Sequence, residues 1–148
     1  MPSHLHRCRM PARSLVGSVA VTLLLTGCGA RGSVEEDRVG DTATEFLAGV
    51  AFAPEAGCDL LAPATLEELE SDGEECAEVL SEAADVRGTA RPSRPGEVRI
   101  DVFGRDAMVR WVDQTLFLAR FDDGWRVTAA GCQPRGKDLP YDCAVEGR

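Results

Sequence analysis

Residues 115–130, TLFLARFDDGWRVTAA, decide the fold class that the sequence predicts. Thr115 to Phe121 is apolar on both faces, which is typical of a strand in the middle of a sheet. Asp122-Asp123-Gly124 places an Asp-Gly pair between two apolar runs, and this is a strong hairpin signal. The run from Trp125 to Ala130 supplies the second strand. The stretch therefore predicts an antiparallel hairpin at the centre of a sheet.

Further strands are predicted upstream of this hairpin. Val98, Ile100 and Val102 alternate with more polar residues, which indicates a strand with one buried face. The same alternation continues over residues 107–112 after a short turn. An edge strand is predicted to begin at Val86. The chain from residue 98 to residue 130 thus predicts a meander of about four strands.

The chain before the strands has a helical period instead. An apolar stripe with spacings of three and four predicts a first helix that Pro54 ends. The sequence Thr65-Leu66-Glu67-Glu68 reads as a capping box that opens a short second helix. Residues 75–84 predict a third helix. Helices followed by antiparallel strands predict an α+β domain, with the helices packed on one face of a curved sheet. The residues of the first stripe are Val39, Ala43, Phe46, Leu47 and Val50.

The beginning of the chain has the pattern of a secretory signal peptide. Residues 1–14 carry basic side chains and no acid, and residues 15–27, LVGSVAVTLLLTG, carry no charge. A basic segment followed by about 7–15 apolar residues is typical of such a signal, whereas a membrane span needs about 17–25 residues. The signal is predicted to cover residues 1–27.

The apolar segment ends in Leu25-Thr26-Gly27-Cys28, which resembles the bacterial lipobox. The resemblance implies cleavage before Cys28 and attachment of lipid to its sulfur. The protein would then be held on the extracytoplasmic face of the cell membrane, with residues 28–34 as a lipidated tether and residues 35–148 as a single domain. Two acyl chains give stable anchoring where one does not. The alternative is an ordinary signal peptide with an incidental cysteine.

Composition excludes several kinds of chemistry for the predicted mature chain. Removal of residues 1–27 takes away both histidines and three arginines, and leaves 13 basic against 25 acidic residues. Without histidine there is no histidine triad, general base or metal ligand. An acidic domain is also a poor binder of nucleic acid. We therefore expect no catalytic residue, no metal site, no cofactor and no nucleic-acid partner.

Four cysteines remain after Cys8 is assigned to the signal and Cys28 to lipid. An even number in an exported domain predicts disulfides, for which three connectivities are possible. Pairing Cys58 with Cys76 and Cys132 with Cys143 is favoured because each pair closes a short loop. A zinc site or a redox pair is disfavoured, since no C-x-x-C occurs.

The order of elements and the hairpin from Phe121 to Val127 resemble the cone-shaped superfamily named after nuclear transport factor two. The ending, with Ala130-Gly131-Cys132-Gln133-Pro134 and then Tyr141-Asp142-Cys143, resembles small actinobacterial lipoproteins. The resemblance implies a cystatin-like cone-shaped roll from about Glu35 onward. Enzymes of that superfamily use an Asp, Tyr or His inside the cone. Here the predicted mature chain has no histidine, and its only tyrosine lies in the tail.

Several residues remain candidates for a site. Asp59 and Asp101 are candidates for buried bases with a raised pKa, although alternation places Asp101 toward solvent. Phe46, Trp111 and Trp125 are candidates to line a pocket for an apolar ligand, and the competing interpretation is that they fill the core.

Charged residues offer two further candidates. Arg110 and Arg120 are either a handle for an anionic ligand or outward-facing strand residues. A run of acidic residues has two interpretations. It is a calcium loop or a docking surface for a cationic partner, or it is simply a solvated helix face, which is the favoured interpretation. The run comprises Glu67, Glu68, Glu70, Asp72, Glu74 and Glu75.

The function expected from the sequence is that of a cell-surface lipoprotein that binds a small apolar ligand or a partner protein and has no catalytic role. Two alternatives stay open. One is an accessory subunit of a membrane complex without a ligand pocket, and the other is an isomerase- or dehydratase-like enzyme with a buried carboxylate.

Overall fold

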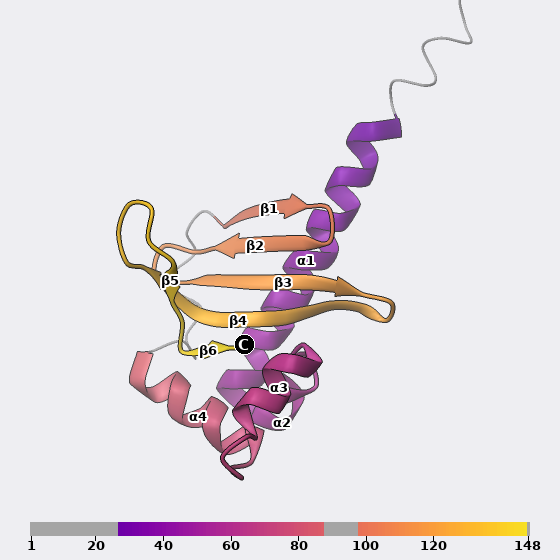
Figure 1. The fold of residues 1–148 in the computed structure, drawn as a ribbon. Helices are drawn as coiled ribbons and strands as arrows, with labels where there is room; N and C mark the ends of the chain where they lie inside the picture. Colours follow the sequence, from indigo (N-terminus) through magenta and orange to yellow (C-terminus); the bar gives the residue numbers. More distant parts are fainter. Residues whose placement is uncertain (1–26, 88–97, 148) are drawn as a thin grey trace, which may run out of the picture.

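The computed structural model describes residues 27–87 and 98–147, with side chains over 34–84 and 98–147. Four helices precede six strands, so the domain belongs to the predicted α+β class (Figure 1). The helices are α1 (Gly27–Phe52), α2 (Pro54–Cys58), α3 (Pro63–Leu69) and α4 (Cys76–Arg87). The strands are β1 (Arg99–Phe103), β2 (Asp106–Arg110), β3 (Thr115–Phe121), β4 (Gly124–Pro134), β5 (Tyr141–Asp142) and β6 (Val145–Glu146).

Helix α1 crosses the strands obliquely and presents its apolar stripe to the sheet (Figure 1). All five residues of the predicted stripe are buried, and Val39 and Ala43 are inaccessible to solvent. The helix begins at Gly27, eight residues before the predicted start, so the segment 28–34 that was predicted as a tether has helical backbone. The beginning of α1 projects past the sheet (Figure 1). The predicted signal segment before it lies outside the described residues.

The second predicted helix starts earlier than its capping-box pattern indicates. Helix α3 begins at Pro63, and its N-cap residue, Ala62, makes no side-chain capping bond. Proline suits the first helical position because its fixed φ is helical and its missing N–H would have no partner there. Thr65 is buried within the helix, and its hydroxyl donates to the carbonyl of Thr128 on β4 at 3.1 Å. The predicted capping box is therefore wrong.

The predicted edge strand at Val86 is also wrong. Residues 76–87 form one continuous helix, α4, which includes Val86. Valine favours strands only weakly, and the helical residues before it set the local conformation. The predicted loop at residues 91–96 lies outside the described residues.

The sheet is antiparallel, in the order β1-β2-β3-β4-β5, and β6 pairs with another part of β4. As predicted, β3 lies in the middle, paired with β2 on one side and β4 on the other. The expectation of about four strands falls short because the tail adds β5 and β6. These short strands pair with β4, so the tail folds back onto the sheet.

The core lies between α1 and the inward face of the sheet. Val109, Leu116, Leu118 and Val127 point inward and are at most 1% exposed. The chain between α2 and α3 also joins the sheet, because Leu61 forms a parallel bridge with Val127. The amide of Ala62 donates to the Val127 carbonyl at 2.8 Å. The short helices are therefore attached to the sheet through this bridge.

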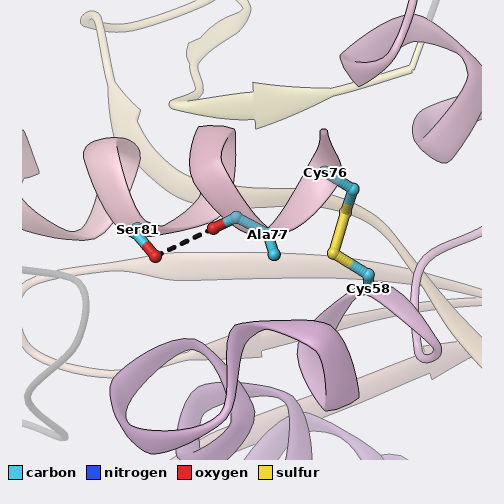
Figure 2. The surroundings of a disulfide bond; sticks show 4 residues. All are labelled: Cys58, Cys76, Ala77 and Ser81. Carbon is cyan, nitrogen blue, oxygen red and sulfur yellow. Dashed lines mark hydrogen bonds between the residues drawn. A yellow bond between two sulfur atoms is a disulfide. The ribbon is translucent and has the colours of Figure 1, made fainter. Parts of the chain in front are cut away.

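Both favoured disulfides are present, Cys58–Cys76 with a separation of 18 residues and Cys132–Cys143 with a separation of 11. The first joins the end of α2 to the first turn of α4, next to the bond from the Ser81 hydroxyl to the Ala77 carbonyl (Figure 2). The second lies between β4 and the residue after β5. Each bridge thus ties a short element to its neighbour.

Candidate functional site

A groove of about 640 Å³ opens between the short helices and the β3–β4 hairpin, and we call it the acidic groove. It exists because the Leu61 bridge holds the α2–α3 connection against β4, while the disulfide holds the start of α4 beside α2. Apolar side chains and the disulfide form part of its lining. These are Leu61, Pro63, Leu66, Phe121, Cys58 and Cys76.

Carboxylates form much of the remaining lining. Glu55, Asp59, Glu70 and Glu75 are exposed, and none of the four takes part in an ion pair among the residues described. Arg126 is the one basic residue in the described lining. Its guanidinium donates to the Asp123 carboxylate and to the Asp59 carbonyl oxygen. The groove is therefore strongly anionic.

The hydrogen bond from Arg126 lowers the pKa of Asp123 and outweighs the opposing effect of partial desolvation. Asp123 therefore stays ionised and holds the guanidinium of Arg126. Because this cation already has two partners, it does little to offset the four remaining carboxylates.

A second groove, of about 1280 Å³, lies between α1 and the β1–β2 edge, and we call it the helix–strand groove. Asp37 and Asp41 line its helical side. Trp111 lines the opposite side together with two exposed valines, Val98 at 45% and Val112 at 84%. This groove combines an acidic helical wall with a strand wall on which exposed apolar side chains stand beside Arg99 and Arg110.

The interior of the domain offers far less room. A cavity of about 10 Å³ lies among α1, α4 and β4, and the only polar side chain in its lining is that of Gln114. Gln114 is 5% exposed, and its Oε1 has no hydrogen-bond partner among the described residues. A space of this size holds about one water molecule. A ligand-sized pocket would need roughly 300–1,000 Å³.

The three predicted pocket aromatics lie in three different places. Phe46 is 1% exposed and borders the small interior cavity. Trp125 is 5% exposed in the core, and its indole Nε1 donates to Glu35 Oε2 at 3.2 Å. Trp111 lines the helix–strand groove. The structure does not bring these side chains together around one cavity.

Glu35 links α1 to the β3–β4 hairpin, a role that no local pattern in the sequence indicates. Besides the indole of Trp125, its carboxylate meets Arg120 at 3.2 Å and Arg38 at 2.8 Å. Arg120, a candidate handle for an anionic ligand, is thus paired within the domain. The contacts span up to 90 residues, so local sequence patterns could not show them.

The two aspartates considered as bases differ in surroundings. Asp59 is exposed at the acidic groove. Partial desolvation raises the pKa of Asp101, but hydrogen bonds and charges from Arg99 and Arg110 outweigh it and leave that pKa below its ordinary value. Arg110, the other candidate handle, is therefore the partner of Asp101. A carboxylate held ionised in this way is a poor proton acceptor.

Within the residues described, no three His, Cys, Asp or Glu side chains are grouped so that they could hold a metal ion. None of the helices in that part of the chain is long and apolar enough to cross a membrane. The side chain of Cys28 lies outside the described residues, although its backbone belongs to the first turn of α1.

Comparison with known proteins gives no match: no family model, curated protein or solved structure matches this chain. The acidic groove could not be predicted from the sequence, because its lining comes from four separate segments: α2, the residues around α3, the start of α4 and the β3–β4 hairpin. Glu70 and Glu75 belong to the acidic run already noted, and this run was the one available signal.

Proposed function

We propose that the chain is an extracytoplasmic lipoprotein, anchored to the outer face of the cell membrane through lipid on Cys28. Residues 35–148 then act as a non-catalytic module that binds a partner protein. The lipobox-like sequence before Cys28 supports the anchor. So does the projecting start of α1, since the seven residues from position 28 to position 34 span about 10 Å as helix. This length would hold the domain clear of the membrane surface.

One observation carries the binding part of the proposal: the large hollows are open surface grooves, whereas the interior cavity measures about 10 Å³. A small apolar ligand is normally buried over most of its surface. An open groove with both polar and apolar lining suits a protein segment better. The lowered pKa of Asp101 argues against this one side chain as a catalytic base.

We infer that the domain is a cone-shaped roll of the kind found in the superfamily named after nuclear transport factor two. The long helix α1 packed across one face of an antiparallel sheet supports this inference. The small interior means that this cone is filled by its own side chains.

The anchor is tested by replacing Cys28 with alanine in the native host and fractionating the cells. We expect the wild-type protein to leave the membranes only with detergent, and the Cys28→Ala variant to be released or to accumulate unprocessed. Cys8→Ala, the same change inside the predicted signal, is the matched control and should behave as the wild type. A processed Cys28→Ala variant that stays as tightly bound would contradict the lipid anchor.

An accessory subunit of a membrane complex is the second candidate, and one observation favours it. Val98 and Val112 expose apolar surface beside Trp111 on the wall of the helix–strand groove. Exposed apolar clusters of this kind mark protein contacts. If this candidate is right, Val112→Ser should weaken co-migration with a membrane complex in native gels, and unchanged co-migration would argue against it.

A further inference from the structure

The acidic groove has two features that a ligand could recognise together. Its apolar lining, from Leu61, Leu66 and Phe121, can accept one or two apolar side chains. Carboxylates from α2 and from the residues that follow α2, follow α3 and precede α4 share the same hollow. A ligand that fills this groove must therefore carry both an apolar part and positive charge.

Charge in the groove is not balanced by the protein itself. Glu55, Asp59, Glu70 and Glu75 have no ion pair among the described residues, and Arg126 is held by Asp123. Like charges around one hollow repel each other, and a bound cation removes that repulsion. This gives a cationic ligand an advantage that a neutral ligand of the same shape does not have.

The charge of the whole chain acts in the same direction. The net charge is −9 for the full sequence and −12 once residues 1–27 are removed. A field of this sign steers cationic partners toward the domain and repels an anionic membrane surface. At about 640 Å³ the groove is also much larger than a metal ion, and among the described residues no three His, Cys, Asp or Glu side chains are grouped so that they could hold one.

We propose that the acidic groove docks a segment of the partner protein in which arginine or lysine side chains flank an apolar side chain. This inference rests on the partner-binding part of the proposed function and adds the chemistry of the partner. The apolar side chain lies against Leu66 and Phe121, and the cations reach Glu70 and Glu75. The disulfide Cys58–Cys76 joins the end of α2 to the start of α4 (Figure 2) and so fixes the helical side of the groove.

The test uses the lipidated chain in mild detergent and two synthetic octapeptides, followed by titration calorimetry. The first peptide is Gly-Arg-Leu-Arg-Arg-Phe-Arg-Gly, and the second has citrulline in place of each arginine, so that shape is kept and charge is lost. We expect the arginine peptide to bind and to weaken as salt increases. The citrulline peptide should bind about tenfold more weakly or worse.

Two double variants locate the binding. Glu70→Gln/Glu75→Gln removes two groove charges from exposed positions and should weaken the arginine peptide about tenfold. Glu45→Gln/Glu82→Gln removes the same two charges from exposed positions of α1 and α4, outside both grooves, and should change binding less than about twofold.

Each contrary outcome overturns the inference. Equal weakening by both double variants would mean that net charge, and not the groove, attracts the peptide. Equal binding of the two peptides would mean that charge plays no part, and the groove would then suit a neutral apolar segment. If no peptide binds while the lipidated chain still crosslinks to a protein in its native membranes, the proposed function stands and the partner chemistry is wrong.

Discussion

The sheet and the short-helix region reach their structures by different means. In the meander of β1 to β4, neighbouring strands in sequence pair with each other, and alternation and one Asp-Gly turn determine where they lie. In the region from α2 to α4, the helices are only 5, 7 and 12 residues long. Such helices are marginal alone. Contacts with distant residues must therefore hold this region in place, and they also shape the acidic groove.

The largest expected effect comes from removing the bridge of the short-helix region. Cys58→Ala/Cys76→Ala should lower the free energy of unfolding by about 3 kcal/mol, because the unfolded chain loses the constraint of an 18-residue loop. Hydrogen exchange should show early opening of α2 to α4 while β2 to β4 stay protected. Uniform opening of both regions would remove the distinction between them.

The disulfide of the tail, Cys132–Cys143, is tested by the same kind of double substitution. Cys132→Ala/Cys143→Ala removes an 11-residue loop, for which the chain-entropy treatment gives a similar loss of about 3 kcal/mol. Here the early exchange should be confined to β5 and β6. If α2 to α4 opened as well, the two bridges would not act on separate regions.

A glycine substitution tests the attachment of α2 to α1. A Cβ added at Gly49 would meet the backbone N of Gly57 at 2.7 Å, so Gly49→Ala should destabilise by about 1–3 kcal/mol. Gly40→Ala on the same helix is the matched control. A Cβ added at Gly40 would meet only the Cδ1 of the flexible Ile100 side chain, at 3.0 Å. Alanine also has a higher helix propensity than glycine, so this variant should lose less stability. Chemical denaturation that gives both variants the same stability would contradict this close approach.

The hydroxyl of Thr65 ties α3 to β4 and gives a smaller effect. Thr65→Val keeps the shape of the side chain but removes its bond to the Thr128 carbonyl, so we expect a loss of about 1 kcal/mol in urea denaturation. Thr44→Val, on the exposed face of α1, removes a bond within one helix and should cost less. An equal or larger loss at Thr44 would show that the α3–β4 contact contributes little.

The smallest expected effect is a dependence on pH. The pKa of Asp101 and that of Asp123 are lowered in the folded state, so the unfolded chain binds protons more readily as acid is added. Their stabilising contribution is present above the ordinary value of 3.8 and is lost as pH falls through the folded pKa. Stability measured from about pH 5 to about pH 3 should fall less steeply for Asp101→Asn/Asp123→Asn. If stability fell as steeply with pH in the variant as in the wild type, the lowered pKa values of these two carboxyl groups would be contradicted.

These differences explain what could be predicted from the sequence. Residues 115–121 and the stripe from Val39 to Val50 were predictable because apolar periodicity reports directly on a buried face. The start of α3 was not, because Thr65 followed by Glu68 looks like a cap, and only the position of Thr128 shows that its hydroxyl bonds across to β4. The strand predicted at Val86 rests on the preference of a single residue. In the structure the preceding helical residues determine its conformation, and Val86 belongs to α4.

The candidate site was less predictable than the fold. Both disulfide pairings followed from spacing, since each closes a short loop. The acidic groove did not, because Glu55, Glu70 and Phe121 come from separate segments that the Leu61 bridge and the Cys58–Cys76 disulfide bring together. In sequence, the acidic residues of a solvated helix cannot be told from those that line a groove. Only the structure shows that Glu70 and Glu75 lie beside apolar side chains in one groove.

Native mass spectrometry of the protein, extracted in mild detergent from its own host's membranes, tests the central claim most directly. The account predicts a chain that begins at Cys28, carries lipid and both disulfides, and is accompanied by a second polypeptide. A chain with unmodified Cys28 would contradict the anchor. A lipidated chain that retains a small apolar molecule and no polypeptide would contradict the assignment as a protein-binding module.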